Sequence, residues 1–152
     1  MEIALKINGE ARSFTSSPGA TLLEVLRGSG YVGVKHGCED GSCGVCTVLL
    51  DGRTVHSCVL LAAQAEGHEI TTIEGIGTYE HPHPLQAAFV AGGAVQCGYC
   101  TPAMILAAKT LLDEHPHPTE AQVREALSGV LCRCTGYVKP VEAVLRVAEG
   151  GV

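Results

Sequence analysis

The sequence of 152 residues predicts an α+β fold, with a β-rich first half and a helical second half. Apolar side chains alternate along residues 3–7, which is the period of a strand with one buried face. After Gly77 they recur at intervals of three and four residues, as on amphipathic helices. This change of period divides the chain into two expected domains, residues 1–76 and residues 77–152.

Two tight turns organise the first half. Asn8-Gly9 and Asp51-Gly52 each supply a pair of residues that tolerates positive φ, which a two-residue hairpin turn requires. The expected elements are strands over residues 3–7, 47–50, 53–55 and 69–73 and an amphipathic helix over residues 21–27. Together they predict a small mixed sheet with one helix across it.

The second half contains four helix-start signals. They are Pro84, an N-cap Thr101 followed by Pro102, a capping box of Thr119 and Gln122, and Pro140. Apolar residues then continue to Leu112 in the second of these helices and to Leu131 in the third. Four short amphipathic helices predict a compact bundle.

The composition limits both the core and the class of partner. The chain is 46% hydrophobic but has no Trp and only two Phe, so a core divided between two domains would be thin. Eight cysteines are the obvious additional stabiliser. The net charge of −6 argues against nucleic-acid binding, which requires a basic surface.

The sequence also predicts a cytoplasmic location. The N-terminus runs directly into the strand pattern and lacks the basic, apolar and cleavage regions of a signal peptide. The longest uncharged stretch, residues 85–108, is interrupted by glutamines, glycines and a proline, so we expect a buried segment there and no membrane span. In a reducing compartment, clustered cysteines indicate metal binding more than disulfides.

The first four cysteines have the spacing of a plant-type [2Fe–2S] loop. They are Cys38, Cys43, Cys46 and Cys58. Gly37, Gly41 and Gly44 interleave with them and allow the backbone to fold around a cluster, with N–H groups near the sulfurs. Four thiolates also suit zinc, but the tight loop and its glycines favour iron–sulfur.

The second four cysteines form a different pattern. They are Cys97, Cys100, Cys132 and Cys134, with 31 residues between the two pairs. Cys100 precedes an expected helix, whose dipole favours a thiolate, and the second pair falls where another helix pattern ends. We therefore expect two helix ends to present two ligands each to one point inside the bundle. The spacing leaves zinc open, whereas a redox dithiol of Cys97 and Cys100 would leave the other pair without a role.

Two further motifs have simpler explanations. The string E-H-P-H-P occurs at residues 80–84 and 114–118, and its histidines could bind metal, but proline before each helix accounts for the repeat. A G-x-G-x-x-G string over residues 28–33 follows a predicted helix and not a strand, so it does not indicate a dinucleotide site.

Three strings in order resemble the small iron–sulfur subunit of the molybdenum hydroxylases, the family of xanthine dehydrogenase, aldehyde oxidoreductase and carbon monoxide dehydrogenase. They are H-G-C-E-D-G-S-C-G-V-C-T at 36–47, Q-C-G-Y-C-T-P at 96–102 and L-C-R-C-T-G-Y at 131–137. The likeness covers almost the whole chain. It implies a β-grasp, plant-type ferredoxin-like domain, a four-helix [2Fe–2S]-binding domain, and a second [2Fe–2S] cluster on Cys97, Cys100, Cys132 and Cys134.

The resemblance also implies a role in a heteromeric oxidoreductase. Such a subunit performs no catalysis itself and carries electrons from a molybdenum–pterin cofactor on a large subunit, through both clusters, often to FAD on a medium subunit. By this likeness Gln96 contacts the pterin. Two alternatives remain: a free-standing ferredoxin-like carrier, and a zinc-stabilised interaction module without redox function.

Overall fold

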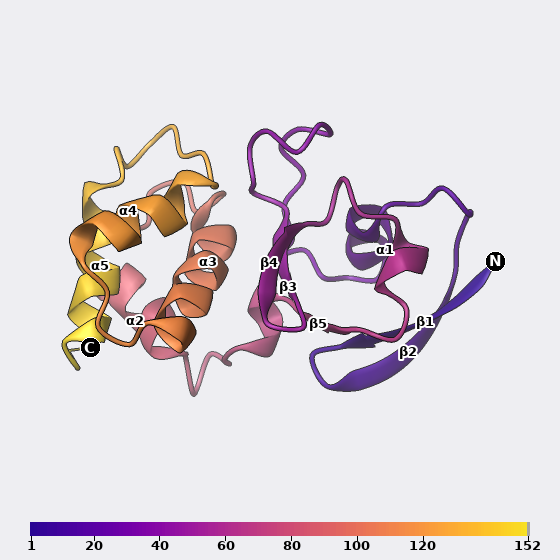
Figure 1. The fold of residues 1–152 in the computed structure, drawn as a ribbon, viewed down its shortest axis with the longest axis horizontal. Coiled ribbons are helices and arrows are strands. Elements are labelled where there is room, and N and C mark those ends of the chain that lie inside the picture. Colours follow the sequence, from indigo (N-terminus) through magenta and orange to yellow (C-terminus); the bar gives the residue numbers. More distant parts are fainter. Residues whose placement is uncertain (152) are drawn as a thin grey trace.

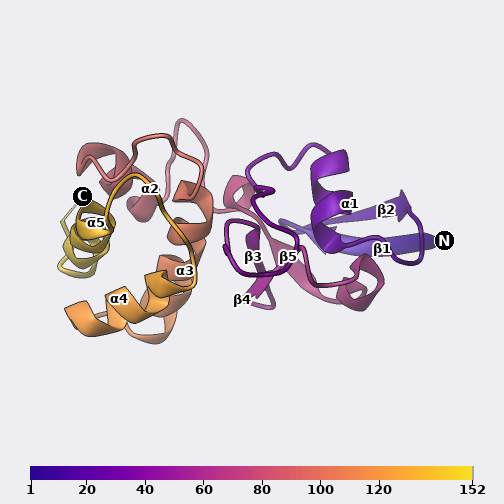
Figure 2. The same cartoon turned by 90° about the horizontal axis from the view of Figure 1, so that it is seen from above.

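The computed structural model describes residues 1–151, and the predicted α+β fold is confirmed. A sheet-containing half and a helical half lie side by side along the longest axis of the molecule (Figure 1). Viewed from above, α3 (Thr101–Glu114) lies between the other helices of the helical half and the hairpin of β3 (Thr47–Leu50) and β4 (Arg53–His56) (Figure 2). No helix within residues 1–151 combines the length and the apolar character needed to cross a bilayer.

A five-stranded mixed sheet forms the first half. Its strands are β1 (Glu2–Ile7), β2 (Glu10–Thr15), β3 (Thr47–Leu50), β4 (Arg53–His56) and β5 (Glu69–Thr71), in the order β2-β1-β5-β3-β4. The central β1–β5 pair is parallel and the other pairs are antiparallel. Both predicted turns have positive φ, 53° at Asn8 and 83° at Gly9, then 50° at Asp51 and 80° at Gly52.

One α-helix packs against the sheet and covers the hydrophobic core of this half. Helix α1 (Leu22–Gly28) begins after Thr21, which forms a capping box with Glu24. Its apolar side packs on the inner face of β1, where Ile3, Leu5 and Ile7 are at most 1% exposed. The alternation along β1 therefore buries one face against the helix, as the sequence predicts.

Two short 3₁₀ helices and four α-helices complete the chain. They are η1 (Ala62–Ala65), η2 (Ile73–Gly75), α2 (Pro84–Ala91), α3 (Thr101–Glu114), α4 (Glu120–Ser128) and α5 (Val138–Ala148). The strand predicted to reach Ile73 ends at Thr71, where η2 follows. The capping box of Thr119 and Gln122 is confirmed at the start of α4.

Three predicted helix boundaries are wrong. Cys100, and not Thr101, occupies the N-cap of α3, with helical backbone angles and no side-chain cap. Helix α4 ends at Ser128, so Leu131 lies in the following loop. Helix α5 begins two residues before Pro140, because Tyr137 adopts a left-handed conformation with φ of 68° and starts the helix at once.

The two halves share an interface built around the first cysteine loop. Val45 from that loop is 5% exposed and belongs to the core of the helical half. The Leu131 N–H donates to the Cys43 carbonyl at 2.8 Å, and the Tyr99 hydroxyl donates to the His36 carbonyl at 2.6 Å. The first cysteine loop is thereby hydrogen-bonded to both loops that carry the second set.

Candidate metal centres

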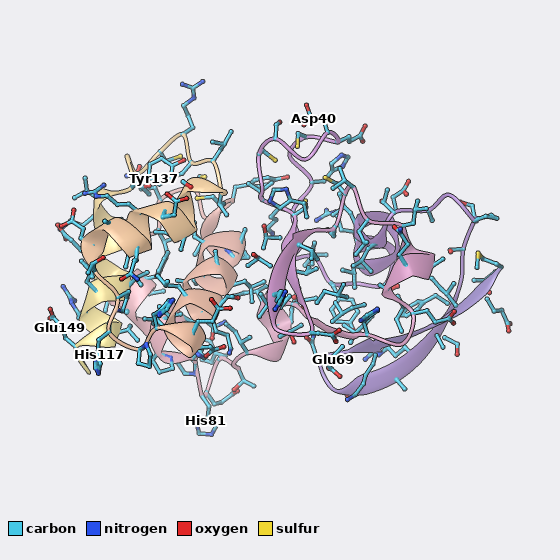
Figure 3. The ribbon with its side chains drawn as sticks, viewed as in Figure 1. Asp40, Glu69, His81, His117, Tyr137 and Glu149 are labelled. Atoms are coloured by element: carbon cyan, nitrogen blue, oxygen red, sulfur yellow. The ribbon has the colours of Figure 1, made fainter. Side chains whose placement is uncertain are left out.

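The first cysteine set lies on a loop between α1 and β3, with its fourth member just after β4. Cys46 and Cys58 are buried, whereas Cys38 and Cys43 are partly exposed. The loop projects beyond the body of the molecule, with Asp40 at its tip (Figure 3). The fold thus brings Cys58 to the loop that carries the other three cysteines, as the sequence predicts.

Glycines and hydroxyls explain the path of this loop. Gly41 and Gly44 have φ values of 81° and 70°, which L side chains rarely adopt. At Gly37 an added Cβ would lie 2.6 Å from the Val45 side chain and 3.0 Å from the Cys43 sulfur. The Ser57 hydroxyl donates to the Cys46 carbonyl at 2.7 Å and ties the loop to the strand that leads to Cys58.

The four sulfurs of the first set associate in two pairs. The Cys43 N–H donates to the Cys38 sulfur at 3.4 Å, and this hydrogen bond lowers the pKa of Cys38 to about 7. Burial raises the pKa of Cys58 to about 11, and the adjacent Cys46 thiol adds to the shift. The pairs are therefore Cys38 with Cys43 and Cys46 with Cys58.

The second set comes together from two loops. Cys97 and Cys100 lie between α2 and α3, and Cys132 and Cys134 lie between α4 and α5. All four line one cavity of about 170 Å³. Its other lining residues are Val45, Tyr99, Leu131 and Arg133. The expected position inside the bundle is wrong: the cavity lies at the end of the bundle, against the first cysteine loop, and Cys97 and Cys134 are exposed.

These sulfurs are also paired. Burial raises the pKa of Cys100 to about 12, and a hydrogen bond with the Cys132 thiol adds to the shift. A hydrogen bond with Cys97 raises the pKa of Cys134. Each loop thus contributes one sulfur to each pair.

Two pairs of thiols at each site fit a [2Fe–2S] cluster, in which four cysteines are shared between two irons. All eight cysteines are free. Within residues 1–151, no group of three or more His, Cys, Asp or Glu side chains is arranged to hold a single metal ion. Burial keeps the protons on Cys58 and Cys100, so binding of iron at these positions has to displace a proton.

Two of the four histidines of the repeated string have side chains with structural roles. The His83 side chain accepts from the Leu85 N–H at 3.2 Å and caps α2. The His117 ring lies 3.1 Å from the Ala148 carbonyl at the end of α5. His81 and His117 lie on the edge of the molecule opposite Asp40 and Tyr137 (Figure 3). The explanation by loop structure therefore fits better than metal binding.

Sequence reasoning missed two residues beside the second site. Thr135 and Tyr137 belong to the string at 131–137, in which only the cysteines were predicted to have a role. The Tyr137 hydroxyl accepts from the Cys132 N–H at 2.8 Å and donates to the Val130 carbonyl at 3.1 Å. Polar residues so close to two cysteines were the available signal. Gln96 is exposed on the loop immediately before Cys97.

Comparisons with known proteins agree with this geometry. The family described as "2Fe-2S iron-sulfur cluster binding domain" matches residues 5–72, and the one described as "[2Fe-2S] binding domain" matches residues 72–145. The nicotinate dehydrogenase small FeS subunit of Eubacterium barkeri is 50% identical over 147 residues, which cover 96% of this chain and 93% of that protein. The chain belongs to the iron–sulfur subunits of the molybdenum hydroxylase family.

Other members of this family extend the likeness. The nicotine 6-hydroxylase small subunit of Paenarthrobacter nicotinovorans is 47% identical over 95% of this chain and 88% of its own length. The crystal structure of quinoline 2-oxidoreductase from Pseudomonas putida 86 contains a chain with a TM-score of 0.94 and 45% identity, covering 99% of this chain and 94% of that one. Aldehyde oxidoreductase from Desulfovibrio desulfuricans matches with a TM-score of 0.92 and 44% identity, over 97% of this chain and 17% of that chain.

This iron–sulfur subunit therefore contributes to an oxidoreductase complex without being its catalytic subunit, and it has larger partner subunits. Its cofactor is iron–sulfur.

Proposed function

We propose that the chain holds two [2Fe–2S] clusters and conducts electrons out of a molybdenum–pterin centre in a partner subunit. The proposed ligands are Cys38, Cys43, Cys46 and Cys58 for the first cluster and Cys97, Cys100, Cys132 and Cys134 for the second. When bound, each cluster supplies a one-electron redox centre. The observation that carries the proposal is geometric: the four cysteines of the second set line one cavity between two loops, and the first set lies on the loop that is hydrogen-bonded to both of these.

The exposed surface around the second site supports a direction for the electrons. Tyr99 and Leu131, which line the cavity, are 46% and 55% exposed, and Val95 and Val138, a few residues from the cysteines along the chain, are 37% and 51% exposed. A permanently bound large subunit would cover this surface. We propose that electrons enter here, and that Gln96, beside Cys97, contacts the pterin.

The first site is then the outlet, toward FAD on a medium subunit or another acceptor. The Cys43 carbonyl accepts from Leu131, the residue before Cys132, so a hydrogen bond joins the two ligand loops. The two buried clusters of apolar side chains support domains 1–76 and 77–152 as the units that carry one site each. Eight free cysteines suit the reducing cytoplasm, where we propose that the complex works.

Metal analysis tests the clusters directly. We expect about four irons and four acid-labile sulfides per chain, and two distinguishable EPR signals after reduction. Colourless protein containing zinc would support the interaction module instead and would refute electron transfer.

Mild purification tests the partners. A permanent subunit should elute from size exclusion together with a large molybdenum-containing chain and a flavin-containing chain. Elution alone at about 16 kDa, with both clusters intact, would support the free-standing carrier.

The role of Gln96 requires a separate experiment. Gln96→Ala should leave iron content and both EPR signals unchanged while lowering turnover or retention of the pterin by the complex. Gln64→Ala, at a glutamine on η1 in the sheet half, is the matched control and should change neither. Equal activity of both variants and the unmodified complex would exclude the pterin contact.

A further inference from the structure

The sulfur of Cys132 lies within hydrogen-bond distance of two groups of Thr135, its hydroxyl and its backbone N–H. The Thr135 hydroxyl oxygen lies 3.1 Å from this sulfur, and the Thr135 N–H donates to it at 3.4 Å. Among residues 1–151, Thr135 supplies the one hydroxyl group within hydrogen-bond distance of a cysteine sulfur. Burial by itself raises the pKa of the Cys132 thiol, but hydrogen bonds from Thr135, from the Cys134 backbone and with Cys100 together lower it.

The direction of the hydroxyl bond follows from its neighbours. The Tyr137 N–H donates to the Thr135 hydroxyl oxygen at 3.2 Å, so that oxygen already acts as an acceptor. A cysteine that binds iron is a thiolate and has no proton to donate. The hydroxyl proton of Thr135 therefore points at the Cys132 sulfur.

Tyr137 holds this arrangement in place. Its hydroxyl bridges the backbone on both sides of Leu131, from the Cys132 N–H to the Val130 carbonyl. Gly136, between Thr135 and Tyr137, has a φ of 63°, and the Tyr137 N–H reaches back to the Thr135 hydroxyl oxygen. Two hydrogen bonds from the side chain and one from the backbone of Tyr137 thus fix the loop, so the Thr135 hydroxyl is positioned before any electron arrives.

A donor fixed at a ligand sulfur has a definite electrostatic effect. Reduction of a cluster adds negative charge that is spread over its sulfurs, and a hydrogen bond to sulfur stabilises the reduced form more than the oxidised form. The charge-assisted bond strengthens on reduction, and the hydroxyl keeps its proton throughout. The surrounding site is partly buried, which limits screening by water.

We propose that Thr135 is a positioning residue whose hydroxyl raises the reduction potential of the second cluster through its hydrogen bond to the Cys132 thiolate. The effect is local to that cluster, because the first site contains no equivalent hydroxyl within the part of the chain described. The inference depends on the proposed cluster at Cys97, Cys100, Cys132 and Cys134.

The test is a redox titration of the full chain, purified with its partner subunits and followed by EPR with dithionite as the reductant. In Thr135→Val the reduced-to-oxidised ratio of the second cluster at a fixed potential should fall about tenfold, which corresponds to about 59 mV for a one-electron couple. Thr135→Ser should restore most of the ratio. The first cluster should titrate as before in both variants and serves as the internal reference.

Thr110→Val is the matched control, because the Thr110 hydroxyl contacts the Leu106 and Gly52 carbonyls and no sulfur. It should leave both potentials unchanged. An unchanged second cluster in Thr135→Val, or an equal shift of both clusters, would overturn the inference.

A second measurement tests the inference even if Thr135→Val fails to hold the second cluster. Exchange into D₂O should remove a strongly coupled exchangeable proton from the hyperfine spectrum of the second cluster in the unmodified protein and in Thr135→Ser. Absence of that coupling in both would overturn the inference. If the unmodified chain contains zinc or fewer than about four irons, the proposed function itself fails, a result that metal analysis separates from an unshifted potential.

Discussion

The two cysteine sites differ in how the chain builds them. Three cysteines of the first site lie on one glycine-rich loop and the fourth follows a short hairpin, so the set comes together within the sheet half. The second site takes two cysteines from each of two loops and leaves Cys97 and Cys134 exposed. The first site is complete within its own half, whereas the second leaves a surface for a partner to cover.

The difference also shows which half depends on the other. The first loop inserts Val45 into the core of the helical half, and Gly44 packs directly against the backbone at Gly129. The second site therefore rests on the first loop as well as on its own helices. Four experiments test this asymmetry.

The largest effect separates the two clusters. Cys100→Ser should lose the second cluster, about two irons per chain and one EPR signal, while the first signal persists. It should also weaken binding of the large subunit. Cys58→Ser is the reciprocal variant and should lose the other signal. Survival of both signals in Cys100→Ser would show that the second set has been assigned wrongly.

A glycine at the contact between the halves comes next. In Gly44→Ala the new Cβ would collide with the Gly129 carbonyl oxygen, and φ is 70°. We expect a cost of about 3 kcal/mol, or a fall in Tm of roughly 6–12 °C. Gly52→Ala has a similar φ of 80° but open space, and should cost about 1 kcal/mol. Equal Tm values for the two variants would mean that the contact is not specific.

Val45 tests whether the helical half needs the first loop. Val45→Ala removes two methyl groups from a side chain buried in the helical core and should destabilise the protein by about 1.5 kcal/mol. Val32→Ala, at a valine that is 58% exposed, should change Tm by less than about 1 °C. Thermal unfolding of the two variants measures the difference.

The smallest effect concerns pH. Helix α1 is capped by Thr21, which does not titrate, but α2 is capped by His83. Burial lowers the pKa of His83, and nearby Lys109 lowers it further. The folded state therefore disfavours protonation of His83, so its contribution is complete above about pH 6.5 and is lost as pH falls through the lowered pKa.

We expect this loss of the α2 cap to cost about 1 kcal/mol and to appear as a fall in Tm as the pH decreases below about 6.5. His83→Asn keeps a capping side chain without a titrating group and should show a smaller fall. A parallel fall in both proteins would place the pH dependence elsewhere.

Much of the architecture could be predicted because its causes are local. Alternation at Ile3, Leu5 and Ile7 predicts β1 and its buried face, and Asn8-Gly9 predicts the turn that follows. The capping box at the start of α4 is formed by hydrogen bonds between Thr119 and Gln122, so it depends on no distant segment. Spacing and glycines alone favoured an iron–sulfur loop for the first site, because its cysteines lie close together along the chain.

The errors occur where distant segments decide the conformation. The start of α5 depends on Tyr137, whose hydroxyl forms hydrogen bonds with the backbone of Val130 and Cys132. The periodicity of apolar residues carries no information about such a contact. The path of residues 129–131 depends on the first cysteine loop, which binds the Leu131 N–H. A pattern based on helix period continued across this segment and extended α4 too far.

Residue patterns alone were enough to predict the α+β order, both hairpin turns and the first cysteine set. These features follow from backbone preferences and from spacing within a few residues, so they do not depend on contacts with distant segments. Packing of the folded chain places the second set at the end of the bundle, paired across two loops, with the Thr135 hydroxyl at the Cys132 sulfur. Those contacts join residues brought together by packing of the two halves, and sequence separation carries no direct record of that packing.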